Sequence, residues 1–95
     1  MKGDTQMKFV VNRCWGGFGL SDWAMEQLGI NVYYDIDRTD SRLIELVENF
    51  PTKVDNRFSA LEVVTIPDES TDWELNDYDG MESIIYVVDG KIRRT

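Results

Sequence analysis

The sequence predicts a small α+β domain, in which two helices pack on a mixed β-sheet and a β-hairpin closes the chain. Three observations lead to this class. The chain has 95 residues, which suits one hydrophobic core, since single cores usually organise about 50 to 200 residues. Short β-branched runs alternate with helical periodicity, and an Asp-Gly pair near the C-terminus is a strong hairpin signal. We therefore expect one domain over residues 7–95, with residues 1–6 as an extension outside the fold.

The first strand and the first helix flank a glycine-rich loop. Residues 7–14 are apolar and β-branched at their centre, which is typical of a buried strand. Ser21 is a good N-cap for a helix over 22–28, because its hydroxyl can accept a backbone N–H of the first turn, and Gly29 supplies a stop. A brief strand or extended link is expected over 31–34.

The clearest helical periodicity lies in the middle of the chain. Apolar residues recur three and four positions apart from Leu43 to Phe50, with Asp40 as the N-cap and Pro51 preventing continuation. A strand over 61–66 follows. Because helical sequence separates this strand from the first one, we expect the two to be parallel neighbours joined by a right-handed crossover.

The C-terminal third carries antiparallel signals. Residues 84–88 and 91–94 read as strands around Asp89-Gly90, a pair that favours a type I′ turn. A further short strand is expected over 73–75, followed by turn-like residues at 76–80. These antiparallel strands, added to the parallel pair, would make the sheet mixed.

Composition excludes several classes of function. Eighteen acidic against ten basic residues give a formal charge of −8, which repels phosphate backbones and anionic lipid, so we expect no direct nucleic-acid or membrane binding. The absence of histidine removes the usual general base and the commonest transition-metal ligand. The lone Cys14 cannot form an internal disulfide and fits a reducing cytoplasm. We expect no enzymatic activity, no catalytic residue, no metal and no cofactor.

The loop over 12–22 joins the first strand to the first helix through three glycines. Such loops can cradle a phosphate, but Asp22 stands where the dinucleotide fingerprint needs its third glycine, and no Walker A Lys-Ser/Thr pair follows. Two interpretations stay open: Trp15 and Phe18 are core plugs around a tight turn, or they stack on a nucleotide-like ligand or enter a partner's pocket beside Arg13. The candidate binding residues of this loop are Arg13, Trp15, Gly16, Gly17, Phe18 and Ser21.

The segment over 68–82 is acidic and contains no Lys or Arg. Its spacing does not satisfy an EF-hand, because taking Gly80 as the sixth loop position places Leu75 first and Tyr86 last. We expect its carboxylates to be solvated. The segment is then either a solubilising surface or a docking surface for a basic protein groove, with aromatic side chains as anchors. The candidate binding residues are Asp72, Trp73, Glu74, Asp77, Tyr78 and Asp79.

Residues 12–21, Asn-Arg-Cys-Trp-Gly-Gly-Phe-Gly-Leu-Ser, resemble the opening of a group of small uncharacterised phage and prophage proteins. Proteins of this group begin with a strand and continue with Asn-x-Cys-x-Gly-Gly-Phe-x-Leu-Ser. The similarity continues through 37–40, 43–48, 61–68, 73–75 and 78–82. The chain departs from the group at its end, Lys-Ile-Arg-Arg-Thr, where relatives carry a basic-aromatic tail. The resemblance implies a phage-borne accessory gene and favours a role in counter-defence.

We therefore expect a phage accessory protein that acts in the host cytoplasm by stoichiometric binding. Its expected partner is a host protein with a basic surface, such as a nucleic-acid or immune enzyme, which the acidic segment would inhibit. The alternative is a sponge for a nucleotide-like ligand, held by the loop over 12–22. Self-association is compatible with both.

Overall fold

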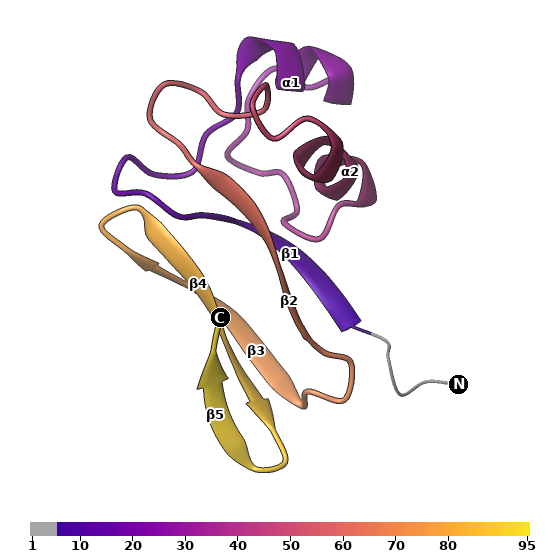
Figure 1. Cartoon of the computed structure of the whole chain (residues 1–95), viewed down its shortest axis with the longest axis vertical. Coiled ribbons are helices and arrows are strands. Elements are labelled where there is room, and N and C mark those ends of the chain that lie inside the picture. The colour runs from indigo at the N-terminus through magenta and orange to yellow at the C-terminus, as the bar shows by residue number, and fades with distance from the viewer. Residues whose placement is uncertain (1–5) are drawn as a thin grey trace.

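The structure is a computed structural model that describes residues 6–95. Within this range the chain forms two helices and five strands (Figure 1). In chain order they are β1 (Gln6–Asn12), α1 (Asp22–Leu28), α2 (Ser41–Asn49), β2 (Leu61–Pro67), β3 (Asp72–Tyr78), β4 (Met81–Val88) and β5 (Lys91–Arg94). The expected α+β class is confirmed. β1 begins at Gln6, inside the expected extension, whose residues 1–5 lie outside the described range.

The described strands form two antiparallel sheets, so the expected mixed sheet with a parallel pair is wrong. β1 pairs with β2 in antiparallel register, from Gln6 with Pro67 to Asn12 with Leu61. The second sheet has the order β3-β4-β5. The reason for the error is where the connecting segment ends. β1 ends at Asn12, and after both helices the chain re-enters the sheet at Leu61, directly opposite Asn12, so β2 runs back along β1.

Local capping signals place both helices where the sequence predicts them. The hydroxyl of Ser21 accepts a hydrogen bond from the backbone N–H of Ala24 at 3.1 Å, and Gly29 ends α1 with a left-handed φ of 70°. The Asp40 carboxylate accepts backbone N–H bonds from the first turn of α2. Residues 31–34 form bends and turns, so the brief strand expected there is wrong. Neither described helix has the length and apolar character that a membrane crossing requires.

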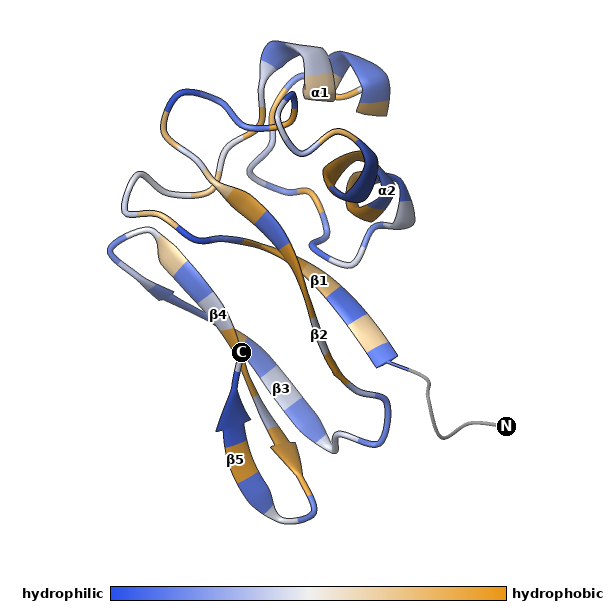
Figure 2. Ribbon diagram, viewed as in Figure 1, coloured by the Kyte–Doolittle hydropathy of each residue, from blue (hydrophilic) through white to orange (hydrophobic). Residues whose placement is uncertain are grey.

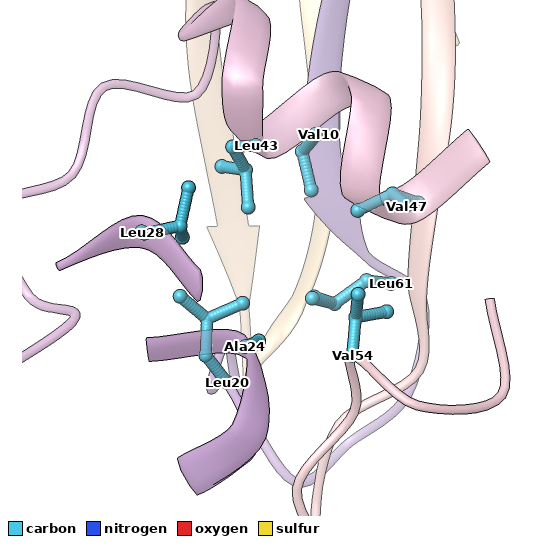
Figure 3. Close-up of a cluster of buried hydrophobic side chains, with 8 residues drawn as sticks. All are labelled: Val10, Leu20, Ala24, Leu28, Leu43, Val47, Val54 and Leu61. Atoms are coloured by element: carbon cyan, nitrogen blue, oxygen red, sulfur yellow. The ribbon is translucent and has the colours of Figure 1, made fainter. Parts of the chain in front are cut away.

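One face of the β1–β2 sheet packs against the helices. α2 turns its hydrophobic side toward this sheet (Figure 2). Figure 3 shows side chains from both helices, from β1 and from β2 meeting in a single cluster. Its buried members are Val10, Leu20, Ala24, Leu28, Leu43, Val47, Val54 and Leu61. Full burial of one such large aliphatic side chain contributes about 1.5 to 3 kcal/mol, so this cluster is a main source of stability.

The other face of β1–β2 packs against the second sheet and makes a second core. Phe9, Val11, Val64 and Ile66 lie on this face and contact Ile84 of β4. The molecule therefore has three layers, with the helices on one side of β1–β2 and β3–β4–β5 on the other (Figure 1).

Two Asp-Gly pairs close the hairpins of the second sheet. Asp89 and Gly90 have φ values of 54° and 72°, as the expected type I′ turn requires, and Val88 pairs with Lys91. Asp79 and Gly80 repeat the arrangement with φ values of 53° and 89°. The expected hairpin is confirmed. The expected short strand is β3, but it extends as far as Tyr78, so the turn expected over 76–80 is wrong for 76–78 and consists of Asp79 and Gly80.

Candidate functional site

Glu82 is buried at the junction between the two sheets, with 3% of its surface exposed. Its carboxylate accepts hydrogen bonds from both terminal nitrogens of Arg38, one of them from Nη2 to Oε2 at 2.9 Å. It also accepts the backbone N–H of Asn12 at 2.9 Å. A buried carboxylate needs such partners because its desolvation is costly. The expectation that every carboxylate of the acidic segment is solvated is wrong for Glu82.

Arg38 connects this carboxylate to the helical layer. Its guanidinium carbon lies 3.6 Å from the centre of the Phe18 ring, and its Nη1 donates to the carbonyl oxygen of Val10 at 3.2 Å. The backbone N–H of Val10 donates in turn to the carbonyl oxygen of Arg38 at 2.8 Å. Arg38 therefore binds β1, β4 and the loop that carries Phe18 into one unit.

The turn that presents Arg38 is held by Asp37. The hydroxyl and the backbone N–H of Thr39 donate to Asp37 Oδ1 at 2.6 and 2.8 Å, and these bonds hold the pKa of the Asp37 carboxyl below its usual 3.8. Replacing Thr39 by Val is expected to raise this pKa, measured by NMR titration of the Asp37 carboxyl carbon. Thr39→Ser keeps the hydroxyl and should leave the pKa low. Equal pKa values in the two variants would contradict the assignment.

The direction of this pKa shift determines the pH range in which Asp37 stabilises the folded state. Because the folded-state pKa of Asp37 is lowered, its contribution to stability is present above the unfolded-state pKa. That contribution is lost as the pH falls through the folded-state value.

Asn12 is a fully buried hub at the end of β1. Its Nδ2 donates to the carbonyl oxygens of Cys14 at 2.7 Å and Gly80 at 2.6 Å, and its Oδ1 accepts the backbone N–H of Ala60 at 2.8 Å. One side chain thus fixes the glycine-rich loop, the β3–β4 turn and the start of β2 relative to one another. Interpretation of the sequence did not single out Asn12, although a polar residue ending an apolar strand is a signal for such a role.

The charge of Arg13 is engaged within the chain. Its Nε lies 3.3 Å from Glu62 Oε1, and its Nη1 donates to the backbone carbonyl oxygen of Glu82 at 3.1 Å. The neighbouring Cys14 thiol lies 3.0 Å from the carbonyl oxygen of Phe58. These contacts fasten the loop to β2 and β4. They leave Arg13 poorly placed to meet an external phosphate.

Two glycines of the loop, Gly16 and Gly19, allow its backbone to pack closely against a neighbouring segment. A Cβ at Gly16 would lie 1.9 Å from the carbonyl oxygen of Phe58, and one at Gly19 would lie 2.1 Å from Nδ2 of Asn56. Gly17 has a φ of 95°, and a Cβ there would meet open space, so its backbone conformation rather than its packing calls for glycine. The backbone of this loop is therefore pressed against residues 56–58 and does not line an open cradle.

The loop residues predicted to bind a ligand have separate roles. Phe18 is partly buried against the first core, as a core plug, while Ser21 caps α1 and donates its hydroxyl to the carbonyl oxygen of Lys53 at 2.6 Å. Trp15 differs, because 60% of its surface is exposed. The core-plug interpretation thus holds for Phe18 and is wrong for Trp15.

Trp15 and Tyr78 meet on the surface, where their rings pack edge to face with centroids 5.9 Å apart. Tyr78 is 67% exposed, and Asp77 and Asp79 on either side of it are exposed as well. Beneath them the Gly80 backbone contacts the loop, since a Cβ there would lie 2.6 Å from the carbonyl oxygen of Trp15. We call Trp15, Asp77, Tyr78 and Asp79 the aromatic-acidic surface.

The remaining predicted residues of the acidic segment divide between two faces of β3. Trp73 pairs with Tyr86 and packs on Phe9 with ring centroids 6.4 Å apart, so it points toward the β1–β2 sheet. Asp72 and Glu74 alternate with it and point to the opposite side. The two expected anchors, Trp73 and Tyr78, therefore do not share one face.

Comparison with known proteins identifies no relative: no family model matches the chain, and no curated protein and no solved structure is significantly similar to it. The resemblance of residues 12–21 to small phage proteins stays a prediction. Among the described residues, no three His, Cys, Asp or Glu side chains are grouped as a metal site would require. The groups that the aromatic-acidic surface presents for contact are aromatic rings and carboxylates.

Proposed function

We propose that this protein works by stoichiometric binding, and that the aromatic-acidic surface contacts a basic surface of a partner protein. The observation that carries the proposal is the exposed pair of Trp15 and Tyr78, 60% and 67% accessible, whose rings pack edge to face next to the exposed residues Asp77 and Asp79. Aromatic side chains of this size dominate interface energies once they are desolvated. Single exposed aromatic residues are common on protein surfaces, whereas neighbouring ones that form a continuous patch are more often part of an interaction site.

The base is rigid because buried contacts hold both sides of the pair. Asn12 ties the loop of Trp15 to the turn that follows Tyr78, and Glu82 fixes Asn12 to Arg38. Little conformational entropy is then lost when a partner binds, which supports affinity from a small contact.

The charge of the surface supports a partner that normally receives a polyanion. The chain carries a formal charge of −8, and carboxylates beside the aromatic pair can occupy positions where the partner would hold phosphates. Together with the resemblance to small phage proteins, this favours a host nucleic-acid or immune enzyme as the partner, inhibited by occupation of its basic groove.

The alternative function, a sponge for a nucleotide-like ligand, has less support. Trp15 is accessible for stacking on a base. Arg13, however, is paired with Glu62, and Gly16 is pressed against Phe58, so the loop lacks the free cation and the open backbone that a phosphate needs.

Binding kinetics test the proposal on a partner recovered from host lysate. Trp15→Ala and Tyr78→Ala are each expected to raise the dissociation rate about tenfold or more, because each removes an anchor. Replacing Asp77 and Asp79 by Lys should lower the association rate, and the wild-type rate should fall steeply with salt, since the Debye length shrinks from about 8 Å at physiological ionic strength to about 3 Å at 1 M.

Tyr34→Ala is the matched control, because Tyr34 is 78% exposed and lies in the loop between the two helices. It should leave both rates unchanged. A partner that binds all of these variants equally well, or one that holds nucleic acid and this protein at once without competition, would contradict the proposal.

A further inference from the structure

The second sheet has an apolar outer face. Its inner face packs on β1–β2 through Ile84, and alternation along β4 turns Ile85 and Val87 to the opposite side. Ile92 of β5 pairs directly with Val87 and is 76% exposed. Antiparallel sheets that face water usually place polar residues there, so three neighbouring β-branched side chains indicate a contact surface.

The outer face is hollowed rather than flat. A groove of about 210 Å³ is lined by Asp72, Trp73, Glu74, Ile85, Val87 and Ile92. A second one of about 240 Å³ lies farther along β3 and β4, next to Arg94. Side chains of a partner can therefore interdigitate with this face as they do between packed sheets.

Opposite charges lie at the two edges of the apolar outer face. Glu74 of β3 pairs with Ile85, and Ile85 pairs with Arg94 of β5, so the three residues stand side by side at one level of the sheet. Because β3 and β5 are the edge strands, the carboxylate lies at one edge of the face and the guanidinium at the other.

We propose that this face binds a second copy of the chain, outer face to outer face, about a two-fold axis that runs along the strands. Rotation about such an axis leaves the position of each residue along the strand direction unchanged. It places the β3 edge of one protomer opposite the β5 edge of its partner. Glu74 then faces Arg94 of the second copy, twice in the dimer, around an apolar centre formed by Ile85, Val87 and Ile92. A two-fold axis perpendicular to the strands would instead oppose β3 to β3, bringing like charges together.

The size of the face sets the expected affinity. A three-stranded patch lies at the low end of specific interfaces, below about 1,200 Å² in total, where complexes are weak and reversible. We therefore expect a dissociation constant in the micromolar range. The inference stands apart from the proposed function, although this axis would leave both aromatic-acidic surfaces at the same end of the dimer.

Sedimentation velocity over protein concentrations from about 1 μM to about 1 mM tests the inference. The wild-type chain should pass from monomer to dimer across this range. Ile92→Asp should keep it monomeric throughout. Glu74→Arg and Arg94→Glu should each raise the dissociation constant tenfold or more, and the double variant Glu74→Arg/Arg94→Glu should restore it to within about threefold of wild type, because the swapped charges again face each other.

Arg93→Glu is the matched control, since it makes the same charge change on the same strand but on the inner side, opposite Tyr86. It should leave the dissociation constant unchanged. Circular dichroism of every variant confirms that the fold is retained. A wild-type chain that stays monomeric up to the highest concentration, or a double variant no better than the single ones, overturns the inference. Loss of partner binding in Trp15→Ala with dimerisation intact separates this interface from the aromatic-acidic surface.

Discussion

Replacing Glu82 by Leu is expected to lower the free energy of unfolding by about 3 to 5 kcal/mol, because it leaves the largely buried guanidinium of Arg38 without its counter-charge. The side chains of Arg38 and Glu82 are 20% and 3% exposed, so water cannot replace the lost partner in full. The backbone N–H of Asn12 loses its acceptor as well. An unpaired buried donor adds about 1 to 3 kcal/mol to such losses, which places this change among the most damaging ones available in the chain.

Urea denaturation followed by circular dichroism measures the effect. Glu45→Leu, an identical change on the exposed side of α2, should stay within about 0.5 kcal/mol of wild type. The double variant Arg38→Leu/Glu82→Leu should lose at least about 1 kcal/mol less than the sum of the two single losses, since removing both charges leaves neither one buried alone. A Glu82→Leu variant as stable as Glu45→Leu would show that the carboxylate carries no structural load.

Gly80→Ala is expected to cost about 2 to 4 kcal/mol, while Gly90→Ala costs about 1 to 2 kcal/mol. Both glycines take the second position of an Asp-Gly turn, with φ values of 89° and 72°, so both variants share the strain of a left-handed alanine. The difference lies in what the added methyl group meets. At Gly80 it would lie 2.6 Å from the backbone nitrogen of Gly17 and from the carbonyl oxygen of Trp15, whereas at Gly90 it meets open space.

Thermal unfolding of the two variants provides the measurement. Because the atoms around Gly80 belong to backbone and cannot rotate away, the Trp15 loop has to move, and Gly80→Ala should also weaken partner binding. Gly90→Ala should leave partner binding intact. Equal losses of stability in both variants would contradict the close packing of the loop on the turn.

Local signals predicted the helices and hairpins well. Ser21 and Gly29 bound α1 because a capping hydroxyl and a left-handed glycine act within one turn of the chain, and Asp89-Gly90 sets its turn by its own backbone preference. The direction of β2 relative to β1 could not be obtained in this way. It depends on where two short helices and their connections return the chain, which no local pattern records.

The sequence identified individual residues of the candidate site, but it did not predict which of them lie together. Trp15 and Tyr78 were each named as candidate binding residues, Trp15 with a core position as the alternative, but their meeting depends on hydrogen bonds from Asn12 across distant segments. Burial of Glu82 was missed because the acidic composition of its neighbours concealed its position. Alternation places it on the inner face of β4 together with Ile84, and this periodicity is the signal that could have identified it.

The paired strands of the β3–β4–β5 sheet are neighbours in the sequence, whereas β1 and β2 are separated by both helices, and we expect this difference to affect the order of folding. β3, β4 and β5 are joined by two-residue turns, so this meander forms from neighbouring residues on the microsecond scale typical of hairpins, about 1 to 10 μs. β1 must instead find β2 across both helices, with Gln6 opposite Pro67. Closing so long a loop costs entropy before any contact repays it, and folding slows as contacts become less local. We therefore expect the pairing of β1 with β2 to be the slow step of folding, and the bonds from Asn12 and Arg38 to Glu82 to form when this pair joins the β3–β4–β5 sheet.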